Sequence, residues 1–202
     1  AECAEQTGAW ASLAQTAQTG QAAAQPAAPA VRGGRPEKIA AGATEVIAEM
    51  RDGVKLAGNL YKPAGAGPFP CVVQRTPYGK DAMFANAAAT KKYTDGGYAY
   101  LVQDVRGKGR SEGFYQAFIN DAFDGYDTVE WMAKQSWCNG SIGIMGASAM
   151  GYTTMLAATM NPPHLKAAFA IVTPSTRLTG TYIGVAYKQK DGGYWSRGQG
   201  VP

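Results

Sequence analysis

The sequence predicts an α/β fold in which helices cover both faces of a mostly parallel sheet. Short apolar runs typical of buried strands alternate with helical patterns, and a clearly alternating hairpin precedes them. Of the 202 residues, 46% are hydrophobic and 17% are charged, which is enough apolar material for a sizeable core. We therefore expect an α/β domain with an antiparallel hairpin at its front edge.

The first 43 residues differ in composition from the rest. They are dominated by Ala, Gln, Thr, Gly and Pro, and such a segment buries too little surface to offset the entropy of ordering it. We predict a flexible leader at 1–43, a partial α/β domain at 44–174 and the start of an incomplete cap at 175–202. An Ala/Gln-rich beginning without Met suits a chain whose export signal has been removed, so we expect a periplasmic or secreted protein.

The hairpin opens the α/β region. Residues 45–50 alternate weakly and 54–61 clearly, with an Arg-Asp-Gly turn signal at 51–53. After a loop rich in Gly and Pro at 63–70, Cys71-Val72-Val73 has the pattern of a buried strand. We therefore expect Cys71 to be a buried thiol.

The remaining segments alternate between helix and strand. An Ala-rich stretch at 80–93 is compatible with a helix, and 98–103 has the pattern of a strand. The clearest helical periodicity spans 121–135, with Asp121 and Asp124 favourably near its N-terminus. After a turn at 138–140, we expect a strand at 142–146, a helix at 149–160 and a strand at 165–172.

Ser148 lies between an apolar strand and a helix, with Gly146 before it and Gly151 after it. A serine presented for attack needs a sharp strand-to-helix turn with small neighbours, and free N–H groups at a helix N-terminus stabilise developing negative charge. The spacing is GxSxxG rather than GxSxG, and it also suits a glycine-rich, phosphate-binding turn with a helix-capping serine. The local pattern leaves both interpretations open.

Further motifs follow one another in a fixed order between residues 46 and 174. They are YKP at 61–63, RTPYGK at 75–80, DVRGKGRSEG at 104–113, DGYD at 124–127, Trp131, WCNG at 137–140 and GAS at 146–148. Together they resemble the cocaine esterase, α-amino acid ester hydrolase and X-Pro dipeptidyl-peptidase superfamily of α/β-hydrolases. The resemblance implies Ser148 as nucleophile of a Ser-Asp-His triad, a helical cap after the strand near residue 172, and a C-terminal jelly roll.

The resemblance also implies an oxyanion hole. In the family, the amide after the serine and a tyrosine hydroxyl from the PYxK loop hold the oxyanion, and these positions are Ala149 and Tyr78 here. A tyrosine hydroxyl suits this role because its rigid ring fixes its reach. Many relatives carry tyrosine where this chain has Ala149, which keeps the backbone donor but leaves the shape of the acyl pocket open. The predicted catalytic residues are thus Ser148, Tyr78 and Ala149, with no cofactor and no metal.

Two charged groups of residues are interpreted as structural. The segment 104–113 has the glycines of a tight loop after a strand. Asp121, Asp124 and Asp127 are spaced at helical offsets without the glycine and glutamate of a calcium loop, which favours helix N-terminal charge over a metal site.

Composition argues against several other functions. The net charge of +4 has no long basic run, which disfavours nucleic-acid binding, and no apolar run is long enough to span a membrane. The three cysteines lack CxxC spacing, so neither a disulfide scaffold nor a metal knuckle is indicated. A small ester or amide, or a short peptide, is the expected substrate.

The sole histidine, His164, ends the helix that Ser148 opens, about 20 Å away at 1.5 Å per residue. That is too far for a general base, and we interpret His164 as a loop or helix-cap residue. In this fold the triad acid and base follow later strands. We therefore expect a serine hydrolase in full-length form and an almost inactive chain alone; the alternative is a non-catalytic binding module on the same scaffold.

Overall fold

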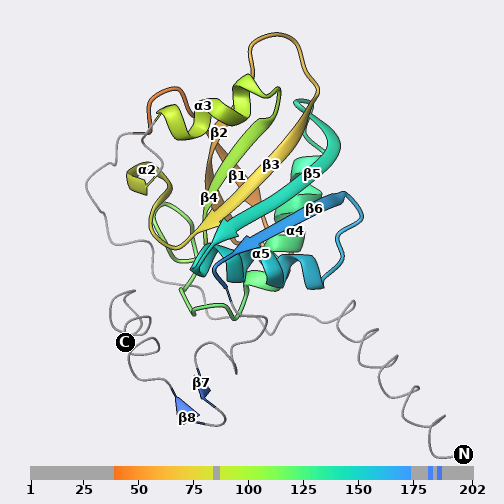
Figure 1. Ribbon diagram of the computed structural model, residues 1–202. Coiled ribbons are helices and arrows are strands. Elements are labelled where there is room, and N and C mark those ends of the chain that lie inside the picture. Colours follow the sequence, from red (N-terminus) through yellow and green to blue (C-terminus); the bar gives the residue numbers. More distant parts are fainter. Residues whose placement is uncertain (1–38, 84–86, 174–181, 184–185, 188–202) are drawn as a thin grey trace, which may run out of the picture.

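The computed structural model describes residues 39–83, 87–173, 182–183 and 186–187 (Figure 1). A six-stranded sheet with the order β1-β2-β4-β3-β5-β6 forms the centre of this part of the chain. The strands are β1 (Thr44–Glu49), β2 (Lys55–Tyr61), β3 (Phe69–Thr76), β4 (Ala99–Asp104), β5 (Cys138–Ala147) and β6 (Leu165–Ile171). The helices are α2 (Lys80–Met83), α3 (Ala87–Asp95), α4 (Asp121–Ala133) and α5 (Ala149–Thr159), and the strands β7 (Tyr182–Ile183) and β8 (Ala186–Tyr187) form a separate pair.

The predicted α/β class and the hairpin are confirmed. β1 and β2 pair antiparallel from Thr44↔Leu60 to Glu49↔Lys55, and β2 continues antiparallel to β4. β4, β3, β5 and β6 are mutually parallel. At the hairpin turn Gly53 adopts a φ of +81°, which glycine tolerates best, and its N–H donates to Met50 O at 2.9 Å.

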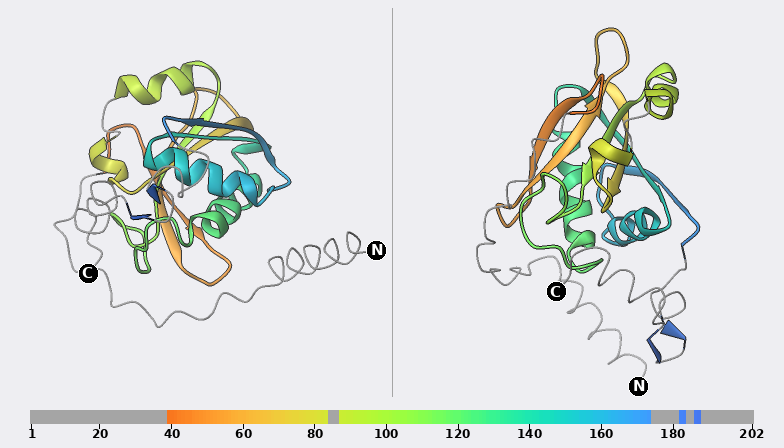
Figure 2. Two further views of the ribbon diagram at one scale, coloured as in Figure 1. Left: turned by 60° about the horizontal axis from the view of Figure 1, so that its bottom comes forward. Right: turned by 90° about the vertical axis from the view of Figure 1, so that its left-hand side faces the viewer.

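Side chains of β4 show how the sheet is covered on both faces. Leu101 packs in a cluster with Val129 of α4 and Ala157 of α5. Its neighbour Tyr100 points the other way and stacks on Tyr93 of α3, with ring centroids 4.2 Å apart. Successive side chains of a strand face opposite sides, so α4 and α5 cover one face and α3 the other, as the views in Figure 2 show.

Some predicted boundaries differ from the structure. The helix expected at 80–93 is two helices, α2 and α3, with residues 84–86 between them outside the described part. The turn expected at 138–140 is part of β5, because Phe69 of β3 pairs with Cys138 and extends the sheet to that residue. Gly140 nevertheless has a φ of +82°, so the chain bends there inside the strand.

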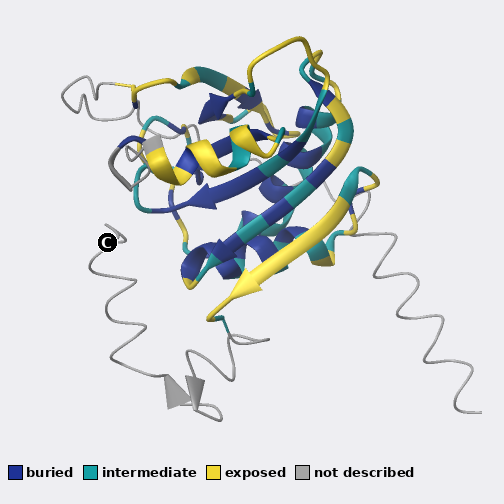
Figure 3. Ribbon diagram, turned by 45° about the horizontal axis from the view of Figure 1, so that its top comes forward, coloured by how far each residue is buried: buried dark blue, intermediate teal, exposed yellow. Residues whose placement is uncertain are grey.

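β6 forms one edge of the sheet and is exposed along almost its whole length (Figure 3). Its apolar side chains include Phe169, which is 62% exposed, and the following Val172 is 82% exposed. Among the described residues, no helix is both long and apolar enough to cross a membrane. The predicted leader and cap fall mostly outside the described residues, and their boundaries stay predictions.

Candidate active site

The carboxyl ends of two neighbouring strands, β3 and β5, meet at one edge of the sheet. The pair Val73↔Ile144 lies three residues before the end of each strand, so Thr76 and Ala147 reach the same level. The chain leaves β3 toward the face covered by α3 and leaves β5 toward the opposite face, into α5. Connections that diverge in this way open a crevice at the carboxyl edge of a parallel sheet, the usual place for a ligand.

Ser148 joins β5 to α5 at this edge through a strained backbone. Its φ of 58° and ψ of −121° lie outside the regions favoured by L-residues, and its side chain is exposed. Its N–H donates to Ile171 O at 2.9 Å, and its carbonyl accepts the Tyr152 N–H at 3.1 Å. Within the described part of the chain its hydroxyl makes no hydrogen bond that caps the helix. The helix-capping interpretation of this serine is therefore wrong.

The two glycines of the GxSxxG segment each have a packing reason. A Cβ added at Gly146 would lie 2.3 Å from Met150 O, and one at Gly151 would lie 2.9 Å from Thr173 Cβ. Both distances are too short for real contacts, because atoms in a packed interior already touch. The sharp turn at Ser148 thus requires small residues on both sides.

The other two predicted site residues lie at the same edge. Ala149 is buried and is the first residue of α5, so its N–H belongs to the first turn, where amides lack intrahelical acceptors. Such amides stabilise a developing negative charge. Tyr78 follows β3 and is half-buried, and its N–H donates to Thr76 Oγ1 at 3.1 Å.

His164 lies at the opposite edge of the sheet, far from Ser148 as the predicted separation of about 20 Å requires. It immediately precedes β6, and its carbonyl accepts the Ile142 N–H at 3.1 Å near the start of the parallel β5–β6 pairing. Its Nδ1 lies 2.8 Å from Glu130 Oε2. Because Ser148 bonds to Ile171 at the far end of β6, about six residues of strand at 3.3 Å each, roughly 20 Å, separate the two sites. His164 is therefore not the base of Ser148.

The glycine-rich loop after β4 is structural, as predicted. The Asp104 carboxylate accepts the backbone N–H of Lys80 at 2.6 Å and that of Arg110 at 3.3 Å, and Ser111 Oγ donates to Asp104 O at 2.7 Å. A Cβ at Gly109 would lie only 2.0 Å from Asp104 Oδ2. Burial raises the pKa of Asp104 to about 6.

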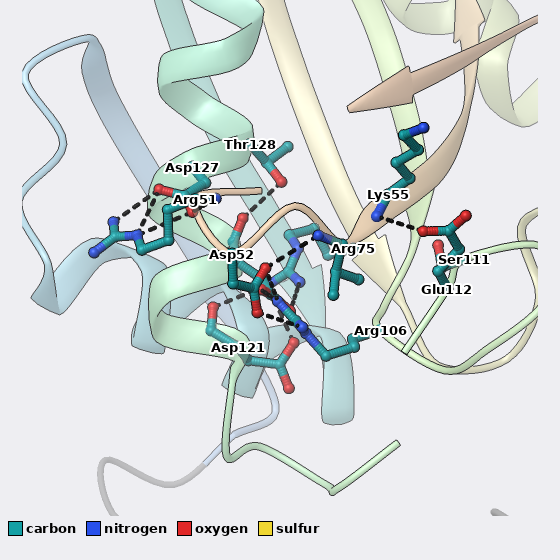
Figure 4. Close-up of polar contacts among 12 residues, drawn as sticks. Arg51, Asp52, Lys55, Arg75, Arg106, Ser111, Glu112, Asp121, Asp127 and Thr128 are labelled. Carbon is teal, nitrogen blue, oxygen red and sulfur yellow. Dashed lines mark hydrogen bonds and ion pairs between the residues drawn. The ribbon is translucent and has the colours of Figure 1, made fainter. Parts of the chain in front are cut away.

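Two of the three aspartates of α4 serve a purpose that the sequence interpretation missed. Asp121 and Asp124 are buried and pair with the fully buried Arg75 of β3, at 3.1 and 3.7 Å. Asp124 also binds Arg106 at 2.6 Å, and Arg106 reaches Asp52 of the hairpin turn at 2.7 Å (Figure 4). Helix N-terminal charge is thus an incomplete account, because these carboxylates mainly neutralise buried arginines.

Asp121 and the third aspartate differ in their surroundings. Burial raises the pKa of Asp121, although the adjacent Arg75 opposes this shift. Asp127 instead forms a bidentate pair with Arg51 near the surface, with Nη2–Oδ1 at 2.7 Å. The sequence signal for the Arg75 pairs was an arginine that follows the apolar run 71–73 in the same strand, since a buried charge requires a partner.

The expectation of a buried thiol at Cys71 is confirmed, and Cys138 on the neighbouring strand is buried in the same cluster. The Cys71 thiol donates to Phe69 O at 3.3 Å. The neighbouring Cys138 thiol, together with burial, raises the pKa of Cys71. A thiol with a raised pKa and no exposure is a poor nucleophile.

Comparisons with known proteins identify relatives that match most of this chain. The family model described as X-Pro dipeptidyl-peptidase (S15 family) matches residues 52–200. A cocaine esterase of Rhodococcus sp. (strain MB1 Bresler) is 39% identical over 128 residues, which are 62% of this chain and 22% of that protein.

Solved structures show the same fold. An α-amino acid ester hydrolase is similar with a TM-score of 0.56 and 34% identity, covering 71% of this chain and 28% of that one. A CocE/NonD family hydrolase from Staphylococcus aureus is similar with a TM-score of 0.55 and 34% identity. The match covers 60% of this chain and 25% of that one. The fold is therefore that of an α/β-hydrolase, and the chain spans about a quarter of the length of these relatives.

Proposed function

The chain belongs to the X-Pro dipeptidyl-peptidase (S15) family, and we propose that the protein of which it forms part is a serine hydrolase with Ser148 as nucleophile. It cleaves esters or amides through an acyl-enzyme. The observation that carries the proposal is the strained, exposed turn of Ser148 at the carboxyl end of β5, beside the end of β3. A strained strand-to-helix turn is the geometry that presents a nucleophilic serine in α/β-hydrolases.

The proposed chemistry follows from what lies at that edge. Ser148 Oγ attacks the substrate carbonyl carbon, its proton passes to a general base, and the carbonyl oxygen becomes an oxyanion. The Ala149 N–H and the Tyr78 hydroxyl donate hydrogen bonds to that oxyanion. As the intermediate collapses, the protonated base gives its proton to the departing alcohol or amine, and an ester remains on Ser148. The base then takes a proton from water, which attacks this ester, and the proton returns to Ser148 as the acid is released.

The general base comes from a part of the full-length protein outside these 202 residues. The sequence contains one histidine, and His164 is bound to Glu130 at the opposite edge of the sheet. Without a base, a serine hydroxyl is a weak nucleophile, and only the residual catalysis of the oxyanion hole and substrate binding remains. We therefore expect the chain alone to be almost inactive and the full-length protein to be active.

The proposal is tested on the full-length protein with a p-nitrophenyl ester and a labelled fluorophosphonate. The Ser148→Ala variant should lose covalent labelling and lower kcat by at least about 10⁴-fold, because the nucleophile is gone. Ser141→Ala is the matched control, since Ser141 is an exposed serine near the other end of the same strand. Labelling that persists in Ser148→Ala, or an unmodified Ser148, would reject the proposal in favour of a binding module.

A carboxylic ester is the proposed substrate class, because the relative with 39% identity is named as an esterase and a similar solved structure as an ester hydrolase. The family description names X-Pro peptides as the alternative. Comparing kcat/KM for p-nitrophenyl acetate and Gly-Pro-p-nitroanilide separates them. A higher value for the anilide would show that the protein is a peptidase.

A further inference from the structure

The segment that carries Tyr78 is held at both of its ends. It runs from Thr76, the last residue of β3, to Lys80, the first residue of α2. Thr76 O accepts the N–H of Val105 at 3.0 Å, and the backbone N–H of Lys80 donates to Asp104 Oδ1 at 2.6 Å. The intervening Gly79 has a φ of +93°, so the segment makes a sharp turn that depends on these anchors.

The Lys80 side chain, at the end of this segment, is fully buried. Its Nζ contacts three acceptors at 2.9–3.0 Å, namely Glu45 Oε1 of β1, Asn59 Oδ1 of β2 and Asp81 Oδ2. An ammonium group has three N–H donors, so each has an acceptor. A charge without contact with water is stable only with such complete pairing, and the position of Lys80 is therefore set by three separate elements.

Five charged side chains and one amide form what we call the Lys80 cluster. Its members are Glu45, Asn59, Lys80, Asp81, Asp104 and Arg110. Arg110 binds Glu45 at 2.6 Å and Asp81 at 3.0 Å. Asn59 Nδ2 also donates to Asp81 Oδ1 at 2.8 Å. The Glu45 and Asp81 carboxylates thus pair with two cations, and Asp104 accepts the backbone N–H groups of the same two residues. These contacts join β1, β2, α2, β4 and the loop after β4 into one unit at the end of the segment that carries Tyr78.

We propose that the Lys80 cluster positions the Tyr78 hydroxyl as an oxyanion donor, so that Lys80 is a positioning residue for hydrolysis. The inference rests on the proposed function of Tyr78. An oxyanion donor is effective only when it is already aimed at the position where the charge develops. Tyr78 is two residues from Lys80, whose three side-chain N–H donors each have an acceptor. The cluster contributes to the chemical step more than to the binding of substrate.

A double-mutant cycle on the full-length protein tests this inference with a p-nitrophenyl ester. Tyr78→Phe should lower kcat by about 10²-fold or more, the usual loss for one oxyanion donor. Lys80→Met should lower kcat by at least about tenfold while KM changes by less than about twofold. In the Tyr78→Phe background, Lys80→Met should lower kcat no further, because the donor that it positions is already absent.

Controls separate this role from general stability. The concentration of folded enzyme is taken from complete fluorophosphonate labelling. Lys91→Met is the matched control, because the Lys91 side chain is exposed and pairs with the exposed Asp95 on α3. Glu45→Gln serves if Lys80→Met does not fold. The Glu45 side chain is 26% exposed and binds Lys80 at 3.0 Å. The Glu45→Gln variant should show a smaller kcat loss, about threefold, and this loss should also disappear in the Tyr78→Phe background.

The outcomes distinguish this inference from the proposed function. If the kcat losses of Tyr78→Phe and Lys80→Met multiply, Lys80 does not act through Tyr78 and the positioning role is rejected. If Tyr78→Phe is as active as the unmodified protein, the oxyanion role and the inference fail together, while loss of activity in Ser148→Ala would still support the serine hydrolase.

Discussion

At the scale of single residues, the turn at Ser148 depends on the lack of a side chain at Gly146. A Cβ there would lie 2.3 Å from Met150 O, a backbone atom in the first turn of α5. Gly146→Ala should therefore displace the start of α5, lower the free energy of unfolding by about 1–3 kcal/mol and reduce fluorophosphonate labelling. Urea unfolding and labelling rates measure both effects.

Gly143→Ala is the matched control for this prediction. Gly143 lies on the same strand, but the atom nearest to its added Cβ is 3.8 Å away, an ordinary contact. Its stability and labelling should stay close to those of the unmodified protein. Equal losses in the two variants would show that glycine on β5 matters for a reason other than the space beside Met150.

Asp104 gives a prediction about pH. Burial raises its pKa to about 6, above its ordinary value of about 3.9, so between these values the folded state binds more protons than the unfolded state. Stability from this group is thus present below about pH 4 and is lost as pH rises through about 6. This rise in pKa corresponds to at most about 3 kcal/mol of the free energy of unfolding, at 1.36 kcal/mol for each pKa unit.

Asp104→Asn removes this titration while keeping a side chain of the same shape. The free energy of unfolding of the unmodified protein, relative to that of Asp104→Asn, should fall as pH rises from 4 to 7. Denaturation at several pH values measures the difference. A constant difference over this range would mean that the Asp104 carboxyl is already ionised at pH 4 in the folded state.

At the scale of elements, the packing of α4 on α5 depends on one close contact. A Cβ at Gly125 of α4 would lie 2.4 Å from the Cβ of the fully buried Ala157 of α5. Gly125→Ala should force the helices apart and cost about 1–3 kcal/mol, although alanine itself favours a helix by about 1 kcal/mol over glycine. Thermal unfolding of the variant measures the net effect.

The reciprocal substitution is the control for this contact. Ala157→Gly in the Gly125→Ala background restores the space, so the double variant should be more stable than Gly125→Ala alone. The stability loss of the double variant could instead equal the sum of the losses in Gly125→Ala and Ala157→Gly. That result would show that the two helices do not meet at these residues.

At the scale of the whole molecule, the exposed edge of the sheet gives a prediction about self-association. β6 presents an apolar sequence in which Phe169 is 62% exposed. An exposed apolar edge strand readily pairs with other chains. The chain of 202 residues expressed alone should therefore self-associate, and Phe169→Lys should lower its apparent mass in light scattering.

Ile119→Lys is the comparison for this variant, because Ile119 is 59% exposed but lies in a loop outside the sheet. It should leave the apparent mass unchanged. An equal fall in both variants would point to added positive charge in general rather than to the edge at β6.

Much of the architecture was predicted from local pattern. Alternation over 54–61 predicted β2, the periodicity of 121–135 predicted α4, and the apolar run at 71–73 predicted the centre of β3 and the buried Cys71. Boundaries were less accurate: 80–93 forms two helices, and β5 begins at Cys138 because it pairs with Phe69. Pairing with a neighbouring strand extends a strand beyond the residues that show the strand pattern. The neighbouring strand is distant in the sequence, so local pattern does not reveal this extension.

The alternation of strands and helices and the need for small residues around Ser148 follow from local sequence, because they depend on neighbours within a few positions. The strand order that brings Tyr78 and Ser148 to one edge of the sheet becomes visible only in the folded chain. The fold also decides that Lys80 and Arg75 are buried and where their acceptors lie. A buried charge is stabilised by groups from several strands, and no single stretch of sequence contains those groups together.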